Sequence, residues 1–327
     1  MSIAKVQLGR RLFREQHLSV TGNYACITCH EPALAYTDGR AKALGATDGA
    51  TKRSSMTLTN VAYNAAFTWG DSSVRTLEAQ MQQPLFNEHP VEIGMKGREA
   101  TVLNWLRSQT SYRQQFEQAF GKEPAVISIG NLIKAIAAYE RTLISGNSAF
   151  DRYVFRDDSG AMSDAAKRGM SLFYSKRVGC AQCHSGLNFN GPIRSERHPQ
   201  AAAAFANTGL YSMDGHGSYP SSDRGLFDVT GKPADMGKMR VPTLRNICLT
   251  APYMHDGSVP SLSVAIDHYA QGGRQLPAGP NAANHLIDRR IQAFALSPQQ
   301  KSDLIAFLAS LTDSEFTADL ELEPTIK

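Results

Sequence analysis

Apolar residues recur at helical spacing along much of this chain. One stripe consists of Ile129, Leu132, Ile133, Ile136 and Ala137, and another of Leu304, Ile305, Leu308 and Leu311. Intervals of three and four residues place each stripe on one face of an α-helix. Ser297 is a good N-cap for the second helix, with Pro298 at its first helical position. We interpret both stripes as core-facing and predict an all-α protein.

A short helical segment occurs in both halves of the sequence. Gly9–Phe13 reads GRRLF, and Gly169–Phe173 reads GMSLF. The second copy has a clear start, because Ser163 can cap the helix and Asp164 suits the positive end of the helix dipole. The recurrence indicates two related helical units.

The boundary between the two units is expected near residue 158. Residues 157–160 are polar and turn-forming, and a chain of 327 residues is long enough for about two domains. We therefore assign one domain to residues 1–157 and the other to residues 158–327. Gly, Ser, Pro, Asn and Asp are frequent between Phe189 and Pro242, which indicates long loops there.

Composition is that of an ordinary soluble globular protein and excludes several classes. Hydrophobic residues make up 42% of the chain and charged residues 20%, so collagen, coiled coil and disorder are set aside. The net charge of +4 comes from dispersed Lys and Arg, so nucleic acid is not an expected partner. No apolar run reaches the ~18 residues of a membrane span, and no signal-peptide core follows Met1 in the sequence as it stands.

Four of the five cysteines form two Cys-x-x-Cys-His motifs. The motif residues are Cys26, Cys29 and His30 in the first half, and Cys180, Cys183 and His184 in the second. Two thiols one helical turn apart can form thioethers to one porphyrin edge, while the adjacent histidine reaches the iron. A single zinc site would leave both histidines unexplained, and a redox pair would need a βαβ setting that is not apparent. We predict two covalently bound c-type haems, and expect Cys248 to pack as a small buried apolar residue.

With the two motifs placed in this way, the chain resembles the bacterial dihaem cytochrome c peroxidase superfamily, which includes MauG. The resemblance extends over nearly the whole sequence, and its most specific stretches are residues 32–39, 80–92 and 241–258. Residues 86–92 and 267–273 are most similar to the MbnH-type branch near MauG. The resemblance implies two cytochrome c-like domains with long loops around the haems. The first haem would react with peroxide and the second would exchange electrons.

The loop after the first motif lacks a histidine. Typical cytochrome c peroxidases carry a second histidine there, which blocks the iron until the partner haem is reduced. No histidine lies between His30 and His89 in this chain. The resemblance therefore implies a five-coordinate first iron that accepts peroxide in the ferric state, unless another side chain closes the site.

The far ligand of the second haem is expected to be Tyr269. Peroxidases of the superfamily place a Met fourteen residues after the histidine that corresponds to His255, and the same count here reaches Tyr269, as in MauG-like enzymes. A phenolate is a hard anion that stabilises ferric and higher states, whereas a thioether favours ferrous iron. The competing ligands are His268, Met254, Met236 and Met239, and Tyr269 could also be an ordinary core tyrosine.

The acid-base group for peroxide is, by resemblance, Glu92. A carboxylate over the open face can take a proton from the near oxygen and return it to the leaving one. Gln80 and Pro84 correspond to other members of this distal wall. Glu88 and His89 resemble a two-residue insertion, which makes His89 a second candidate for proton transfer. Ile93 stands where relatives often carry Met, and all of these could also be solvated loop residues.

The two tryptophans have different expected roles. Trp69 corresponds approximately to the residue that lies between the haems in the family, where an indole can relay electrons. Trp105 lies on an amphipathic segment beside Leu103 and Leu106 and is expected in the core. MauG also carries a Trp just before its second haem motif, but this chain has Val178 and Gly179 there, so its exit route to a substrate must differ.

A calcium ion between the haems is a further implication of the resemblance. Family members hold Ca²⁺ with an Asn side chain and backbone carbonyls, and the matching positions are Asn60, Thr250 and Pro252. Oxygen donors suit a hard cation, and waters would complete the shell. From the residues alone, Asn60 would be assigned only as a turn residue.

The favoured hypothesis is a dihaem oxidoreductase that uses hydrogen peroxide to reach a bis-Fe(IV) state and then oxidises a partner protein over a distance. The MbnH-type resemblance implies a tryptophan of a copper-binding protein, converted to kynurenine. The first alternative is a cytochrome c peroxidase that takes electrons from a small redox protein, with a Met ligand and reductive activation. The second is an electron carrier with strong sixth ligands on both haems. Haem attachment and resemblance together imply the periplasm.

Overall fold

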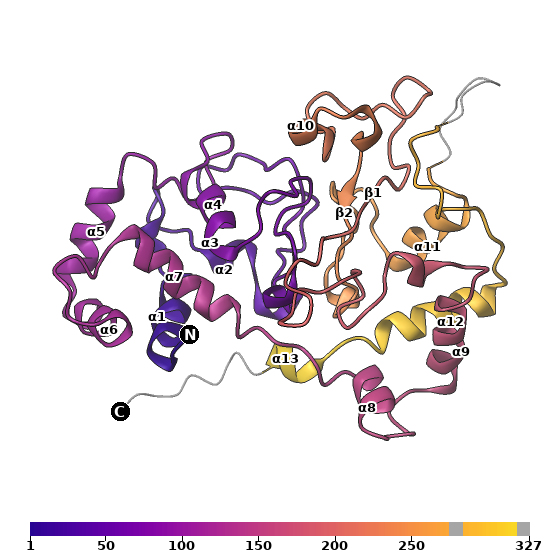
Figure 1. Cartoon of the computed structure of the whole chain (residues 1–327), viewed down its shortest axis with the longest axis horizontal. Helices are drawn as coiled ribbons and strands as arrows, with labels where there is room; N and C mark the ends of the chain where they lie inside the picture. Colours follow the sequence, from indigo (N-terminus) through magenta and orange to yellow (C-terminus); the bar gives the residue numbers. More distant parts are fainter. Residues whose placement is uncertain (275–283, 319–327) are drawn as a thin grey trace.

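The structure is a computed structural model that describes residues 1–274 and 284–318. Its helices are α1 (Ile3–Phe13), α2 (Cys26–Cys29), α3 (Leu77–Gln80), α4 (Gln82–Phe86), α5 (Glu99–Ser108), α6 (Thr110–Phe120), α7 (Ile129–Glu140), α8 (Ala149–Phe155), α9 (Asp164–Phe173), α10 (Phe227–Thr230), α11 (Leu262–Ala270), α12 (Pro298–Ala309) and α13 (Ser314–Ala318). The strands β1 (Phe205–Ala206) and β2 (Met239–Arg240) pair antiparallel, with Phe205 opposite Arg240. The mostly helical prediction is confirmed, and long loops fill the region between Phe189 and Pro242 (Figure 1).

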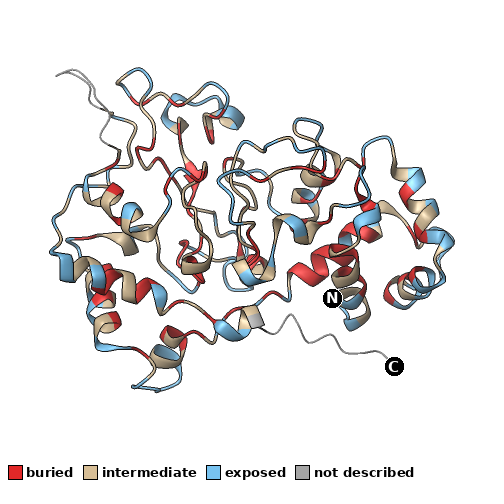
Figure 2. Ribbon diagram, turned by 180° about the vertical axis from the view of Figure 1, so that it is seen from behind, coloured by how far each residue is buried: buried red, intermediate tan, exposed pale blue. Residues whose placement is uncertain are grey.

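The N-terminal unit is built on the crossing of α1 and α7. A Cβ added at Gly9 would overlap the backbone carbonyl of Ala135, so the two helices meet at a contact that only glycine permits. Around this crossing the predicted stripe on α7 is buried from Leu132 to Ala137, as the red face of that helix in Figure 2 shows, and Ile129 is half-buried. Trp105 packs on the edge of the same core and stacks on His17, with ring centroids 4.0 Å apart, in agreement with a core role.

The C-terminal unit repeats this crossing with α9 and α12. A Cβ at Gly169 would overlap the backbone carbonyl of Asp303, as Gly9 would overlap that of Ala135. Ser163 caps α9 by accepting a hydrogen bond from Ala166 N, and Ser297 caps α12 from Gln300 N, as predicted. The GRRLF and GMSLF segments therefore occupy equivalent places in two related helix pairs.

The repeat extends to the loops that follow each haem motif. Asn60 and Asn246 both adopt a left-handed backbone conformation, with φ values of 54° and 59°. The Asn60 N–H donates to the Leu143 carbonyl at 2.9 Å, and the Asn246 N–H donates to the Leu311 carbonyl at 3.1 Å. Each asparagine thus ties the loop of its unit to the chain just beyond the crossing helix.

Helices α8 and α13 pack across the predicted boundary at residues 157 and 158. Although α8 precedes that boundary, Phe150 belongs to the second core, and its N–H donates to Ser310 O at 3.0 Å. Conversely, Phe316 of α13 packs on Tyr36 of the first unit, with ring centroids 5.6 Å apart. By packing, the first unit ends before α8, and Figure 1 shows α8 beside α9. Helix α8 thus precedes the predicted boundary but packs in the second core, and α13 follows the boundary but packs on the first unit.

Gly9→Ala should destabilise the N-terminal unit, because the new methyl group meets the Ala135 carbonyl and forces α1 and α7 apart. Overpacking of this kind costs about 1–3 kcal/mol. Gly130→Ala is the matched control, since no atom lies within 4 Å of a Cβ at that position of α7. It should stabilise the protein by about 0.5–1 kcal/mol. Urea unfolding measures both, and equal stability of the two variants would contradict the crossing contact.

Candidate dihaem active site

The second haem motif places His184 ready to bind a metal through one nitrogen. Cys180 opens a short 3-10 turn that ends at Gln182, with Cys183 and His184 just beyond it. His184 Nδ1 lies 2.8 Å from the carbonyl oxygen of Phe189. Burial lowers the pKa of His184, so the ring is neutral, with Nδ1 the donor and Nε2 the free metal-binding nitrogen.

The first motif has the same geometry. Cys26 and Cys29 are the two ends of α2, and His30 Nδ1 lies 2.9 Å from the carbonyl oxygen of Tyr36. Burial lowers the pKa of His30 as it does for His184. Tyr36 and Phe189 both have positive φ values, 63° and 51°, which turn their carbonyls toward the imidazoles. The two motifs therefore hold their histidines in the same way, although Cys26–Cys29 is α-helical and Cys180–Gln182 is a 3-10 turn.

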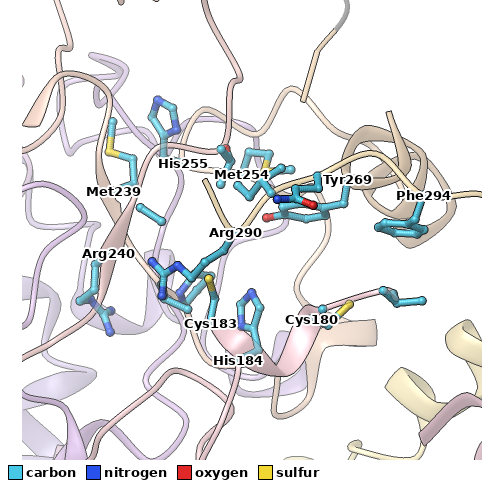
Figure 3. Close-up of a pocket in the computed structure, with 18 of the residues that line it drawn as sticks. Cys180, Cys183, His184, Met239, Arg240, Met254, His255, Tyr269, Arg290 and Phe294 are labelled. Carbon is cyan, nitrogen blue, oxygen red and sulfur yellow. The ribbon is translucent and has the colours of Figure 1, made fainter. Parts of the chain in front are cut away.

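A pocket with about 870 Å³ of empty space lies over the second motif. Cys180, Cys183 and His184 line one side, and Tyr269 of α11 lies across from them (Figure 3). Two unbonded thiols, a neutral imidazole with an oriented Nε2 and this space together fit a covalently bound haem.

The competing ligands of the second haem separate in the structure. Tyr269, Met254 and Met239 line the pocket, whereas His268 and Met236 do not. His268 Nε2 lies 2.8 Å from the carbonyl oxygen of Thr208, which occupies the nitrogen it would need for iron. Burial raises the pKa of Tyr269, so in a pocket without a cation its hydroxyl is a neutral phenol.

His255 also lines the pocket, a role that its sequence context did not predict. Its side chain is buried, and its ring meets the Trp69 ring edge to face at 6.5 Å. Its Nε2 lies 4.0 Å from Asp223 Oδ2. Only the fold brings these three residues together, because Trp69 and Asp223 are far apart in the chain.

The segment that carries Glu92 is fixed against α4. The Ile93 N–H donates to the Pro84 carbonyl at 2.9 Å, which brings the predicted Pro84 and Glu92 segments together. Burial raises the pKa of Glu92, although Asn87 Nδ2 donates to its Oε1 at 3.2 Å and lowers it in part. Burial also raises the pKa of Cys29 to about 11, and the Glu92 charge adds to that rise. Glu92 thus lies near the first haem motif.

The other two distal candidates lie at different depths. Gln80 is half-buried at the last position of α3. His89 is exposed in the turn that the Glu88–Val91 bridge closes, and Glu88 pairs with Lys96 in the same exposed turn. The apparent insertion therefore forms a surface turn, and the structure does not bring His89 inside with Glu92.

Trp69 lies between two cavities. It lines the pocket over the second haem motif and also a second cavity with about 540 Å³ of empty space. Its Nε1–H donates to Ser54 O at 3.0 Å. Arg240 lines both cavities beside it and is only 6% exposed. Burial lowers the pKa of Arg240 to about 10, and no carboxylate of the described residues pairs with it. A buried cation in this position suits a carboxylate group of a bound cofactor.

Of the three predicted calcium ligands, two line the second cavity and Asn60 does not. Thr250 and Pro252 line it, but the asparagine beside them is Asn64 rather than Asn60. Asn60 Oδ1 accepts the Ser145 N–H at 2.8 Å, and its Nδ2 donates to the Ser145 carbonyl at 2.8 Å. Both ends of the Asn60 amide are therefore used by the backbone.

Asn246 repeats part of this arrangement, because its Oδ1 accepts the Asp313 N–H at 2.8 Å in the equivalent place of the second unit. The buried Asn190 donates to Asn64 Oδ1 at 3.0 Å and leaves its own Oδ1 without a partner among the described residues. The lining residues Asn64, Thr250 and Pro252 offer oxygen donors, which suit a hard cation. Cys248, which we expected to be buried, is half-buried.

Comparison with known proteins agrees with this geometry. A sequence signature described as di-haem cytochrome c peroxidase matches residues 3–159. The methylamine utilization protein MauG of Methylorubrum extorquens is 33% identical over 94% of this chain and 78% of its own length. Cytochrome c551 peroxidase of Pseudomonas aeruginosa is 31% identical over 97% of this chain and 81% of its own. The chain belongs to the di-haem cytochrome c peroxidase family of peroxidase-type oxidoreductases.

Within this family the chain is similar to MauG-like proteins. The crystal structure of a MauG-like protein associated with microbial copper homeostasis has a TM-score of 0.94 and 38% sequence identity, and the match covers 100% of this chain and 94% of that one. None of the described helices is long and apolar enough to cross a membrane.

Tyr269→Phe should change the optical spectrum of the second haem in the holoprotein, because it removes the only hydroxyl oxygen among the three candidate ligands. His268→Gln, one residue away and bonded to Thr208 instead, is the matched control and should leave the spectrum unchanged. If Met254→Leu alters the spectrum and Tyr269→Phe does not, the iron has a thioether ligand and Tyr269 is a core residue.

Proposed function

We propose that this protein uses hydrogen peroxide to oxidise a tryptophan on a partner protein in the periplasm, and that the partner is a copper-binding protein. The similarity to a MauG-like protein associated with copper homeostasis supports the choice of partner. The position of Tyr269 across the pocket from His184 is the observation that carries the proposal. Kynurenine is the expected product at the modified residue.

The two haems, when bound through Cys26, Cys29 and His30 and through Cys180, Cys183 and His184, supply the redox chemistry that splits peroxide and holds two oxidising equivalents. The protein contributes the fixed imidazoles and the acid-base group. Glu92 in its ionised form would take a proton from one peroxide oxygen and return it to the other, which would leave as water. The hydrogen bond from Asn87 orients the carboxylate for both transfers.

We propose that Trp69 and Arg240 link the two haem sites. The indole of Trp69 lines the pocket over the second haem motif, and its Nε1–H donates to Ser54 O. This bond fixes the position from which the indole would relay electrons. Arg240 beside it would pair with a haem propionate, which would supply its missing counter-charge. We propose that Ca²⁺ binds at the second cavity, which Asn64, Thr250 and Pro252 line.

A second candidate function is reduction of peroxide with electrons from a small redox protein. Met254 and Met239 line the same pocket as Tyr269, and a thioether ligand there would favour a conventional electron-accepting haem. Addition of peroxide to the fully ferric protein, without a reductant, distinguishes the two functions.

The test is addition of one equivalent of peroxide to the fully ferric holoprotein without any reductant, followed by stopped-flow absorbance. We expect a rapid spectral change at both haems. In a periplasmic extract with excess peroxide, because two peroxides are needed for each tryptophan, we expect tryptophan-to-kynurenine conversion in a copper-binding protein by peptide mass spectrometry. Tyr269→Met should abolish the conversion. A ferric protein that stays inert until one haem is reduced is a conventional peroxidase, and that result would refute the proposal.

Glu92→Gln should slow the reaction with peroxide by about 10²–10⁴-fold, the usual contribution of a general acid-base group. Because burial raises the pKa of Glu92, the wild-type rate should fall as pH drops through a value above the ordinary ~4.3 of Glu. The variant should lose this acid limb. Glu88→Gln, on the exposed side of the same segment, is the control and should behave as wild type; an intact acid limb in Glu92→Gln would exclude Glu92 as the base.

Trp69→Phe should keep the fast step at the first haem and delay the spectral change at the second, because the indole between the cavities is lost. Stopped-flow traces at wavelengths specific to each haem measure the delay. Trp105→Phe, in the core of the first unit, is the control. Simultaneous changes at both haems in Trp69→Phe would show that electrons take another path.

A further inference from the structure

Glu140 is a buried carboxyl group that the proposed chemistry does not use. It is the last residue of α7, only 6% exposed, and its Oε2 has no hydrogen-bond partner. An unsatisfied carboxyl in a protein interior costs free energy, so its presence calls for a physical explanation.

The internal repeat identifies the equivalent residue of the second unit. Gly9 meets Ala135 and Tyr139 of α7, and Gly169 meets Asp303 and Phe307 of α12. Three residues beyond Glu140 and three beyond Leu308, the carbonyls of Leu143 and Leu311 accept the equivalent Asn60 and Asn246 N–H groups. Glu140 therefore corresponds to Leu308, which is buried and apolar.

Two neighbouring positions are also polar in the first unit and apolar in the second. In the first unit the hydroxyls of Tyr36 and Tyr139 lie 3.2 Å apart, whereas the equivalent Phe189 and Phe307 form an apolar ring contact at 6.3 Å. Two units with the same helix crossing thus differ in polarity beside the haem motif. Packing alone does not require Glu140, because leucine fills the same place in the second unit.

Glu140 directly follows Tyr139, which belongs to the same core cluster as Cys26 of the first haem motif. Its charge would raise the pKa of the Cys26 thiol, to which burial makes the larger contribution. The charged groups that shift the pKa of Glu140 are Arg141 on its own helix and Glu78 of α3, which pair with each other at 2.8 Å. Arg10 of α1, and Arg14 just beyond the end of that helix, partly offset the rise in the pKa of the Tyr36 hydroxyl that burial causes. Burial raises the pKa of Glu140 to about 8, so the carboxyl is protonated at neutral pH.

We propose that Glu140 is the proton-releasing group that compensates the charge gained by the first haem when it loses an electron. The inference rests on the first motif holding a haem, and it does not depend on the partner protein. Peroxide, or an electrode in the test, takes the electron; the Oε–H bond of Glu140 breaks, its electron pair stays on the carboxylate, and the proton leaves toward Glu78 and solvent. Reduction returns both the electron and the proton. The carboxylate would then stabilise the oxidised haem, whereas the apolar Leu308 occupies the equivalent position in the second unit.

The test is a spectroelectrochemical titration of each haem's ferric–ferrous potential against pH in the holoprotein. In the wild type, the potential of the first haem should fall with rising pH between the pKa of Glu140 in the oxidised protein and its pKa in the reduced protein, with a slope of one proton per electron. Glu140→Gln should lose that slope. The oxidised-minus-reduced infrared spectrum should also lose a protonated-carboxyl band.

Controls keep the outcome interpretable. Glu78→Gln, which removes only the surface carboxylate, should keep both the slope and the band. Glu140→Leu reproduces the residue of the second unit and serves if the glutamine variant fails to fold, with circular dichroism and haem content as checks. A slope that persists in Glu140→Gln, or that disappears in Glu78→Gln alone, would overturn the inference. A ferric protein inert to peroxide would refute the proposed function while leaving this titration valid.

Discussion

Everything at the two candidate haem sites depends on how each motif histidine is held. His30 and His184 both direct Nδ1 at a backbone carbonyl, and in both units the residue that supplies it has a left-handed backbone conformation. This hydrogen bond fixes the tautomer and leaves Nε2 for iron. The loops that provide the carbonyls are in turn tied to the crossing helices through Asn60 and Asn246. The helix crossing thus sets the orientation of a metal ligand.

The same frame serves two different chemical environments. Around the first motif, Glu92, Glu140 and a hydrogen-bonded tyrosine pair provide groups that can carry protons. Around the second motif, the equivalent core positions are apolar and Tyr269 lines the pocket. These surroundings fit proton-coupled chemistry at the first haem and storage of oxidising equivalents at the second.

Local sequence predicted the parts of the structure that depend on local spacing. The haem motifs, the α7 and α12 stripes and the Ser163 and Ser297 caps needed only residues a few positions apart, and the fold class followed from them. Packing across long sequence distances was not visible in this way. The transfer of α8 to the second core depends on Phe150 meeting residues around Phe307, far along the chain. The absence of Asn60 from the lining of the second cavity was not visible either, because its amide bonds to the backbone of Ser145, far along the chain.

The central claim is that a phenol oxygen, and not a thioether, is the far ligand of the second haem. X-ray absorption at the iron edge of the ferric holoprotein tests it directly, because sulfur and oxygen scatter differently in the first coordination shell. We expect only nitrogen and oxygen ligands in the wild type and a new sulfur signal in Tyr269→Met. A sulfur scatterer in the wild-type protein would contradict the account and identify a methionine ligand, with Met254 and Met239 as the candidates that line the pocket.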